Sequence, residues 1–236
     1  MKLLIQNLHK EKHLVCDLIK QHNEPDIMLV QEVNIKSEDK NIISNRYGYD
    51  YASFTSRMGY GTAIYALKDK KGSIINNNNS NKNDSNDKIL TNIRHVKSPH
   101  NETGGIISKK TTIATYDDKV ELVSFHGYNG QPFYKNIQYL VDHVKAVIEV
   151  LNPDQASPAI FGGDFNTWSV EHVNAVSKVL HEAGFTLAYS WPYPNRTVPL
   201  DHVYVRGSNI KIGESSIYSN KSDHNGMIIE LEISSR

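Results

Sequence analysis

The chain is built from many short runs of β-branched and apolar residues, and this pattern limits its fold more than any other feature of the sequence. Runs of about four to eight such residues between turn residues are typical of β-strands. We predict strands at Lys2–Gln6, Asp26–Gln31, Gly61–Leu67, Ile89–Val96, Thr111–Tyr116, Val120–Phe125, Ala159–Gly162, Leu200–Val205, Asn209–Ile212 and Met227–Ile233.

Helical periodicity is found in three stretches, at Glu11–Gln21, Tyr134–Leu151 and Val170–Ala183. Gly184 follows the last of these and suits the left-handed conformation that often ends a helix. Many strands with a few helices between them predict an α+β fold, in which two β-sheets pack face to face and the helices lie outside.

The domain organisation follows from what separates these runs. No Pro/Gly/Ser-rich linker divides the 236 residues into two halves, so we expect a single domain spanning residues 1–236. Residues 76–88, NNNNSNKNDSNDK, have almost no apolar side chains to offset the entropy cost of ordering. We predict a disordered surface insertion there.

Composition narrows the cellular setting and the partners. Lysine plus arginine and aspartate plus glutamate number 26 each, so a nucleic-acid partner would need a local basic patch. No run is apolar and long enough to span a bilayer, and Cys16 has no cysteine partner. We therefore expect a cytoplasmic monomer without a membrane span.

Polar residues gather where the predicted strands end or begin. The clusters are Asn7, Gln31–Glu32, His126–Asn129, Gly163–Asn166, and Asp201 with Ser222–His224. Carboxylate and amide oxygens are the ligands of a hard cation such as Mg²⁺, and histidines beside carboxylates suit proton transfer. The sequence has neither a pair of cysteines nor a His-Glu-x-x-His motif, which makes a zinc site less attractive.

The order Asn, Gln-Glu, His, Gly-Asp-x-Asn, Asp, Ser-Asp-His resembles the endonuclease/exonuclease/phosphatase family, which includes deoxyribonuclease I and the apurinic endonucleases. The phrases GGDFNTWS, LDHVYVRG and SDHN are similar to those of uncharacterised bacterial members. The resemblance extends from Asn7 to His224 and implies the four-layer α/β/β/α sandwich of deoxyribonuclease I. It also implies a Mg²⁺-dependent hydrolase of phosphate esters, with Mn²⁺ as the alternative cation.

The resemblance also assigns roles. It implies that Glu32 is the main metal ligand, supported by Asn7 and Asp223. It implies that Asp164 orients or deprotonates the attacking water, that Asn166 holds a phosphate oxygen, and that His224, oriented by Asp201, contacts the scissile phosphate. His126 matches a position that protonates the leaving oxygen, and Asn129 is a weaker match to a phosphate contact.

Two further residues are candidates for substrate binding. Trp191 and Arg196 lie in the loop sequence between two of the motifs, where they could stack on or grip a substrate. Packing of a proline-stiffened loop explains them equally well.

Three functions remain open at this stage. We favour a phosphodiesterase or nuclease acting on DNA, RNA or a small diester by in-line attack of water. A phosphomonoesterase acting on a lipid or sugar phosphate would use the same residues. An inactive binding module is less favoured, because all the motif residues are intact.

Overall fold

A computed structural model describes residues 1–36, 42–56, 59–68, 88–102, 107–130 and 136–234. Within these ranges the strands form two six-stranded sheets. Sheet A has the order β11 (Ile210–Tyr218), β12 (Gly226–Ile233), β1 (Lys2–Asn7), β2 (Ile27–Asn34), β4 (Tyr60–Leu67) and β3 (Tyr49–Thr55). Sheet B has the order β5 (Leu90–Lys97), β6 (Lys110–Tyr116), β7 (Val120–His126), β8 (Ala159–Asp164), β10 (Asp201–Arg206) and β9 (Thr186–Trp191).

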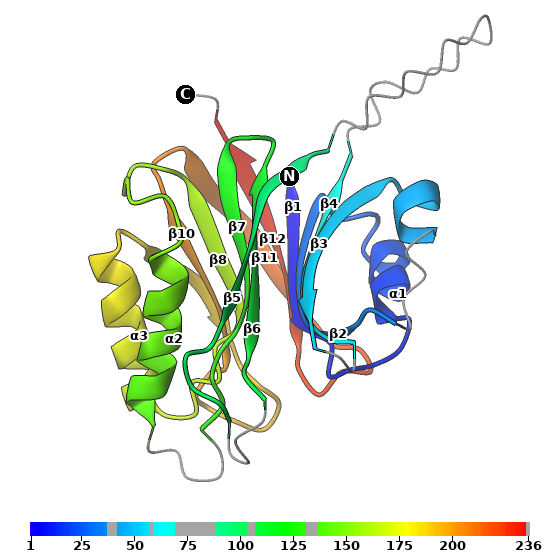
Figure 1. Cartoon of the computed structure of the whole chain (residues 1–236). Helices are drawn as coiled ribbons and strands as arrows, with labels where there is room; N and C mark the ends of the chain where they lie inside the picture. The colour runs from blue at the N-terminus through cyan, green and yellow to red at the C-terminus, as the bar shows by residue number, and fades with distance from the viewer. Residues whose placement is uncertain (37–41, 57–58, 69–87, 103–106, 131–135, 235–236) are drawn as a thin grey trace, which may run out of the picture.

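The two sheets lie face to face with helices on their outer faces, which gives four layers (Figure 1). Helix α1 (Leu14–Gln21) covers sheet A, and helices α2 (Ile137–Ile148) and α3 (Val170–Glu182) cover sheet B. Each sheet is mixed, because β1 pairs in parallel with β2 and β7 in parallel with β8. The predicted fold is confirmed.

The apolar side chains form three buried clusters, because successive residues of a strand point to opposite faces of its sheet. Along β1, Leu3 and Ile5 belong to the cluster between the sheets, whereas Leu4 belongs to the cluster between sheet A and α1. A third cluster, containing Phe125 and Leu140, fills the space between sheet B and its two helices. Successive residues of a strand point to opposite faces, so a sheet covered on both sides needs such continuous apolar strands.

Every predicted strand corresponds to one in the structure, but the prediction omitted β3 and β9, which are both edge strands. Helix α1 begins at Leu14 and not at Glu11, because His13 has a φ of 60° and the chain still turns there. Helix α3 ends at Glu182, one residue before the predicted end at Ala183, and Gly184 has the predicted left-handed conformation with a φ of 84°.

Some predicted features fall outside the described residues. These are the start of the second predicted helix at Tyr134 and residues 76–87 of the predicted insertion. A π-helical segment, η1 (Ile42–Arg46), was not predicted. No helix within the described ranges is long and apolar enough to cross a membrane.

Candidate active site

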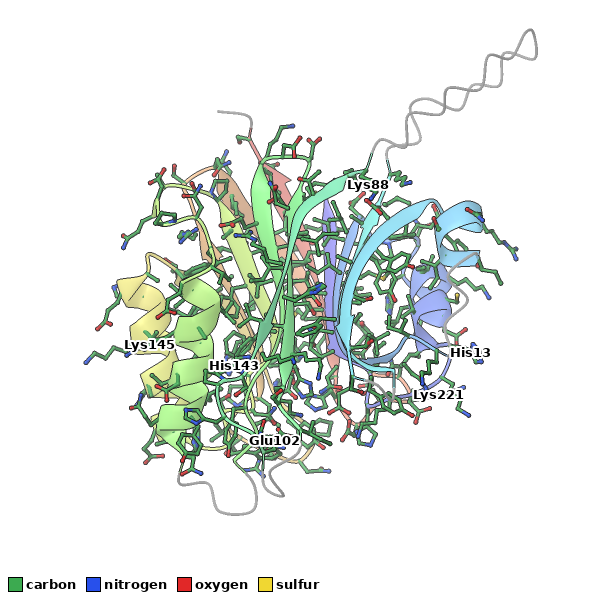
Figure 2. All side chains as sticks on the ribbon, in the orientation of Figure 1. His13, Lys88, Glu102, His143, Lys145 and Lys221 are labelled. Carbon is green, nitrogen blue, oxygen red and sulfur yellow. The ribbon has the colours of Figure 1, made fainter. Side chains whose placement is uncertain are left out.

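Strand register brings the predicted motifs to one end of the sandwich. In sheet A, Asn7 at the end of β1 pairs with Gln31 of β2. In sheet B, His126 pairs with Asp164, which pairs in turn with Asp201. The carboxyl ends of parallel strands meet at one edge of a sheet, and an antiparallel neighbour adds its first residue there. Figure 2 shows Lys88 at one end of the sandwich and Glu102 at the other. Glu102 contacts the site residue Lys109, so the site lies at the end away from Lys88.

Gly163 lies where space is limited both by the neighbouring strand β7 of its own sheet and by a side chain of sheet A. Its φ is 142°, and a Cβ atom at this position would lie 2.1 Å from the backbone oxygen of Phe125 and 2.8 Å from Nε2 of Gln31. Only glycine fits such a position without moving a backbone atom. The glycine before Asp164 is therefore needed for the geometry of the site.

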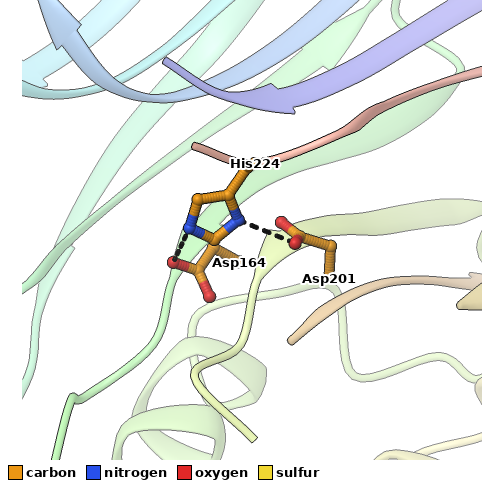
Figure 3. A group of neighbouring side chains, drawn as sticks. All are labelled: Asp164, Asp201 and His224. Carbon is orange, nitrogen blue, oxygen red and sulfur yellow. Dashed lines mark hydrogen bonds and ion pairs between the residues drawn. The ribbon is translucent and has the colours of Figure 1, made fainter. Parts of the chain in front are cut away.

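Asp164, Asp201 and His224 form the centre of the cluster, and all three are buried (Figure 3). Nδ1 of His224 lies 2.8 Å from Oδ2 of Asp201, and its Nε2 lies 3.7 Å from Oδ2 of Asp164. Burial alone would lower the pKa of His224, but the negative charges of Asp201 and Asp164 outweigh it and raise the pKa to about 10. His224 is therefore a protonated imidazolium held between two carboxylates.

Two asparagines fix the carboxylate of Asp164. Nδ2 of Asn7 donates to Oδ2 of Asp164 at 3.0 Å, which joins the two sheets across the site. The backbone N–H of Asn166 donates to Oδ1 at 2.8 Å, and the side chain of Asn166 donates to the carbonyl of Gly127. Both asparagines are buried, and Asn166 has a φ of 54°. Asp164 is held rigidly, as a water-orienting group requires.

Glu32 lies at a β-bulge within β2. Its φ is 50°, and the pairing of β2 with β4 shifts between Gln31 and Val33. β-Bulges of this kind turn a side chain away from its regular direction and are common beside active sites. The carboxylate lies 3.5 Å from Nε2 of His126, and its Oε2 atom is buried with no hydrogen-bond partner among the described residues.

Lys109, which directly precedes β6, is a site residue that the sequence analysis did not assign. Its Nζ lies 2.7 Å from Nε2 of His126, 3.4 Å from Oε1 of Glu102 and 3.8 Å from Oε1 of Glu32. An ammonium group can only donate, so Nε2 of His126 accepts and the ring is neutral. Burial, followed by the charge of Lys109, also holds the pKa of His126 well below its usual value. The assigned role of His126 as proton donor stays a prediction.

Glu102 contacts Lys109 and is itself bound by Asn129. The backbone N–H of Asn129 donates to Oε1 of Glu102 at 3.1 Å, and its side-chain oxygen accepts from Nε1 of Trp168. Burial raises the pKa of Glu102, and the charge of Lys109 opposes that rise. The structure thus shows Asn129 in contact with protein groups, and its predicted contact with phosphate stays untested.

Two aromatic side chains, Tyr193 and Trp168, form a cluster next to His224. The ring of Tyr193 lies edge-on to His224 at 4.8 Å, and its hydroxyl donates to Asp223 at 3.0 Å. The guanidinium of Arg196 lies 4.6 Å from the ring centre of Trp168, which is 6.2 Å from that of Tyr193. Arg196 is therefore linked to His224 through the rings of Trp168 and Tyr193, and its contact with substrate stays a prediction.

Trp191 does not have the predicted role. It is 0% exposed at the end of β9, packs in the core between the sheets, and donates from Nε1 to the carbonyl of Asn225. A fully buried indole cannot stack on a substrate. The prediction of substrate binding by Trp191 is wrong, and packing explains the residue.

The site residues fit a divalent cation. Oε2 of Glu32, which accepts no hydrogen bond among the described residues, is the type of ligand that Mg²⁺ takes, and Asn7 and the exposed Asp223 flank the same end of the sandwich. Asp164, Asp201 and His224 form a second set, whose ligand atoms all lie within 4.8 Å of one another. The first set offers only oxygen ligands, which a hard divalent cation prefers, whereas the second includes a histidine nitrogen.

Fold and site together are of the deoxyribonuclease I type, two packed β-sheets with a carboxylate-rich cluster at one end. The model of the endonuclease/exonuclease/phosphatase family matches residues 5–224, and the chain belongs to this family, whose members are phosphoesterases. A UPF0294 protein of Vibrio campbellii is 22% identical over 99% of this chain and 78% of its own length. A UPF0294 protein of Vibrio parahaemolyticus is 32% identical over 37% of this chain and 32% of its own length.

Solved structures share the fold at low sequence identity. A humanised TDP2 of D. rerio has a TM-score of 0.70 at 14% identity and covers 98% of both chains. The catalytic domain of human Nocturnin has a TM-score of 0.67 at 13% identity, over 99% of this chain and 93% of its own. The 3'-5' exonuclease NExo of Neisseria meningitidis has a TM-score of 0.67 at 14% identity, over 98% and 100%.

Proposed function

We propose that the protein is a Mg²⁺-dependent phosphodiesterase that cleaves by in-line attack of water. The observation that carries this proposal is the buried chain of contacts from Asp201 through His224 to Asp164, beside a carboxylate oxygen of Glu32 that accepts no hydrogen bond among the described residues. Such a site has a fixed carboxylate for water, a cationic group for the phosphate and an oxygen ligand for a metal.

Each residue has a defined task in this mechanism. Asp164, fixed by Asn7 and by the backbone N–H of Asn166, orients the attacking water and accepts its proton. The imidazolium of His224, oriented by Asp201, donates a hydrogen bond to a phosphate oxygen and stabilises the charge that develops there. A divalent cation held by Glu32, with Asn7 and Asp223, would supply positive charge to the phosphate.

Two structural relatives support a nucleic-acid substrate. D. rerio TDP2 has been solved in complex with a single-stranded DNA product, and the 3' phosphatase NExo from Neisseria has been solved bound to a product DNA hairpin. The first favours DNA as a substrate class. The second keeps a phosphomonoesterase as the alternative, because the same site would remove a terminal phosphate.

The test is turnover of matched substrates with Mg²⁺, with Mn²⁺ and with excess chelator. Bis-p-nitrophenyl phosphate and p-nitrophenyl phosphate separate diester from monoester cleavage, and end-labelled single-stranded DNA, RNA and an inositol phosphate define the substrate class. Glu32→Gln and Asp164→Asn are expected to lose most turnover, whereas Asp118→Asn, an exposed carboxylate in the turn between β6 and β7, keeps it. Full turnover in chelator, or in Glu32→Gln, would refute the proposal.

A further inference from the structure

Glu32 is in contact with two lysines that come from separate parts of the chain. Nζ of Lys10 lies 3.6 Å from Oε2, and Nζ of Lys109 lies 3.8 Å from Oε1. The side chain of Lys10 is 54% exposed, whereas that of Lys109 is 13% exposed. The ammonium of Lys109 is therefore the less screened of the two and acts more strongly on the carboxylate.

Lys109 does not depend on Glu32 for its place in the site. Its two shorter contacts are to His126 at 2.7 Å and to Glu102 at 3.4 Å, and Glu102 is itself fixed by the backbone N–H of Asn129. The contact with Glu32, at 3.8 Å, is the longest of the three. Lys109 can lose this contact and still be held at the site by the other two.

One carboxylate cannot neutralise a divalent cation and two ammonium groups at once. A cation that binds Glu32 is repelled by Lys109, and it takes from Lys109 one of its negative partners. An ammonium deprived of that partner favours a new anion nearby, and a phosphate bound at the site supplies one.

We propose that Lys109, assisted by Lys10, is an internal counter-ion of Glu32 that a divalent cation displaces and that then binds the substrate phosphate. This inference rests on the proposed function of the same site. It makes Lys109 a phosphate-binding residue, and it makes cation and phosphate bind cooperatively. By linkage, the phosphate raises the affinity for the cation by the same factor as the cation raises the affinity for the phosphate.

The test measures Mn²⁺ binding by calorimetry, with and without dimethyl phosphate as a diester anion that is not consumed. Lys109→Met is expected to bind Mn²⁺ about tenfold more tightly than the wild type, because even at the dielectric constant of water a unit charge a few ångströms from a divalent ion has about that effect. Its turnover of bis-p-nitrophenyl phosphate is expected to fall, with a higher KM. Tighter metal binding with weaker catalysis is the signature of the exchange.

Two variants serve as matched controls. Lys109→Arg keeps the charge and is expected to bind Mn²⁺ as the wild type does. Lys110→Met removes a charge one residue away, where Nζ lies 5.6 Å from the ring centre of Phe54, and is expected to leave Mn²⁺ affinity unchanged. Dimethyl phosphate is expected to tighten Mn²⁺ binding in the wild type and to have a smaller effect in Lys109→Met. Melting temperatures confirm that each variant is folded.

The outcomes separate this inference from the proposed function. If Glu32→Gln weakens Mn²⁺ binding but Lys109→Met binds Mn²⁺ no more tightly than the wild type, the counter-ion exchange is wrong and the metal site stands. Equal tightening in Lys110→Met would also overturn it, since the effect would then be one of general charge. If Glu32→Gln binds Mn²⁺ unchanged, the proposed metal site fails.

Discussion

Replacing Asp201 by asparagine tests the catalytic assignment most directly. Asp201 is 0% exposed, and its Oδ2 lies 2.8 Å from Nδ1 of His224. Asparagine keeps the shape but removes the charge that raises the pKa of His224 and fixes the orientation of its ring. Losing an orienting carboxylate of this kind costs on the order of 10²–10⁴ in kcat, or roughly 3–5 kcal/mol in the activation barrier.

The assay measures kcat for bis-p-nitrophenyl phosphate at saturating Mg²⁺, together with Mn²⁺ affinity. We expect a large loss of kcat in Asp201→Asn, a similar loss in His224→Ala, and a double mutant barely worse than either, because residues that act as a unit are not additive. Mn²⁺ affinity is expected to stay near that of the wild type. Fully additive losses, or a tenfold loss of metal affinity, would show that Asp201 belongs to a metal site with Asp164 and His224.

Three further predictions concern the fold. Removing residues 77–87 is expected to leave melting temperature and turnover nearly unchanged, because the flanking Lys88 lies at the end of the sandwich away from the site; a loss of turnover would make the segment a recognition element. Gly163→Ala is expected to lower the unfolding free energy by about 1–3 kcal/mol in urea titrations, because a Cβ atom there meets a backbone oxygen at 2.1 Å; unchanged stability would contradict the close approach. Burial lowers the pKa of His143 and of His202 to about 3. Both rings are therefore neutral in the folded state over a pH range in which the unfolded state, with a pKa of 6.5, binds protons. The unfolding free energy should fall as the pH drops from 6.5 towards 3, by at most about 2.7 kcal/mol per pH unit for the two histidines together. His143→Gln should make the slope of unfolding free energy against pH shallower, because one of the two groups that bind a proton on unfolding is gone. Urea titrations at several pH values would measure this slope.

The central strands were predictable because a sheet covered on both faces requires continuous apolar runs, as in Leu3–Ile5 of β1. Strands β3 and β9 were not, because their sequences, YDYASFT and TLAYSW, mix polar with apolar residues and contain no continuous apolar run. Five of the six residues of β9 are at least partly exposed, and only Trp191 is buried. The same feature explains the error at Trp191, since a tryptophan in a polar stretch next to a proline resembles a loop residue more than a core residue.

The site was predictable where it depends on strand ends and was missed where it depends on a loop. Asp164 and Asp201 each lie at a terminus of a buried strand, so the apolar run beside them points to the site. Lys109 and Glu102 come from the loop before β6, and no periodicity in the sequence indicates that this loop folds towards Glu32. Lys109 and Lys110 are adjacent lysines in the sequence, and charge in a sequence does not reveal which of them is buried.

Local charge balance links the site to its proposed cation. The whole chain has a formal net charge of zero, but in the ion-pair network at the site five carboxylates face two lysines and the protonated His224. These are Glu32, Glu102, Asp164, Asp201 and Asp223, against Lys10, Lys109 and His224. The excess of two negative charges would repel a phosphate from the site, and one divalent cation neutralises it. We therefore expect a bound cation to strengthen the attraction of the lysines and His224 for the substrate, which is the cooperativity that the Lys109 variants test.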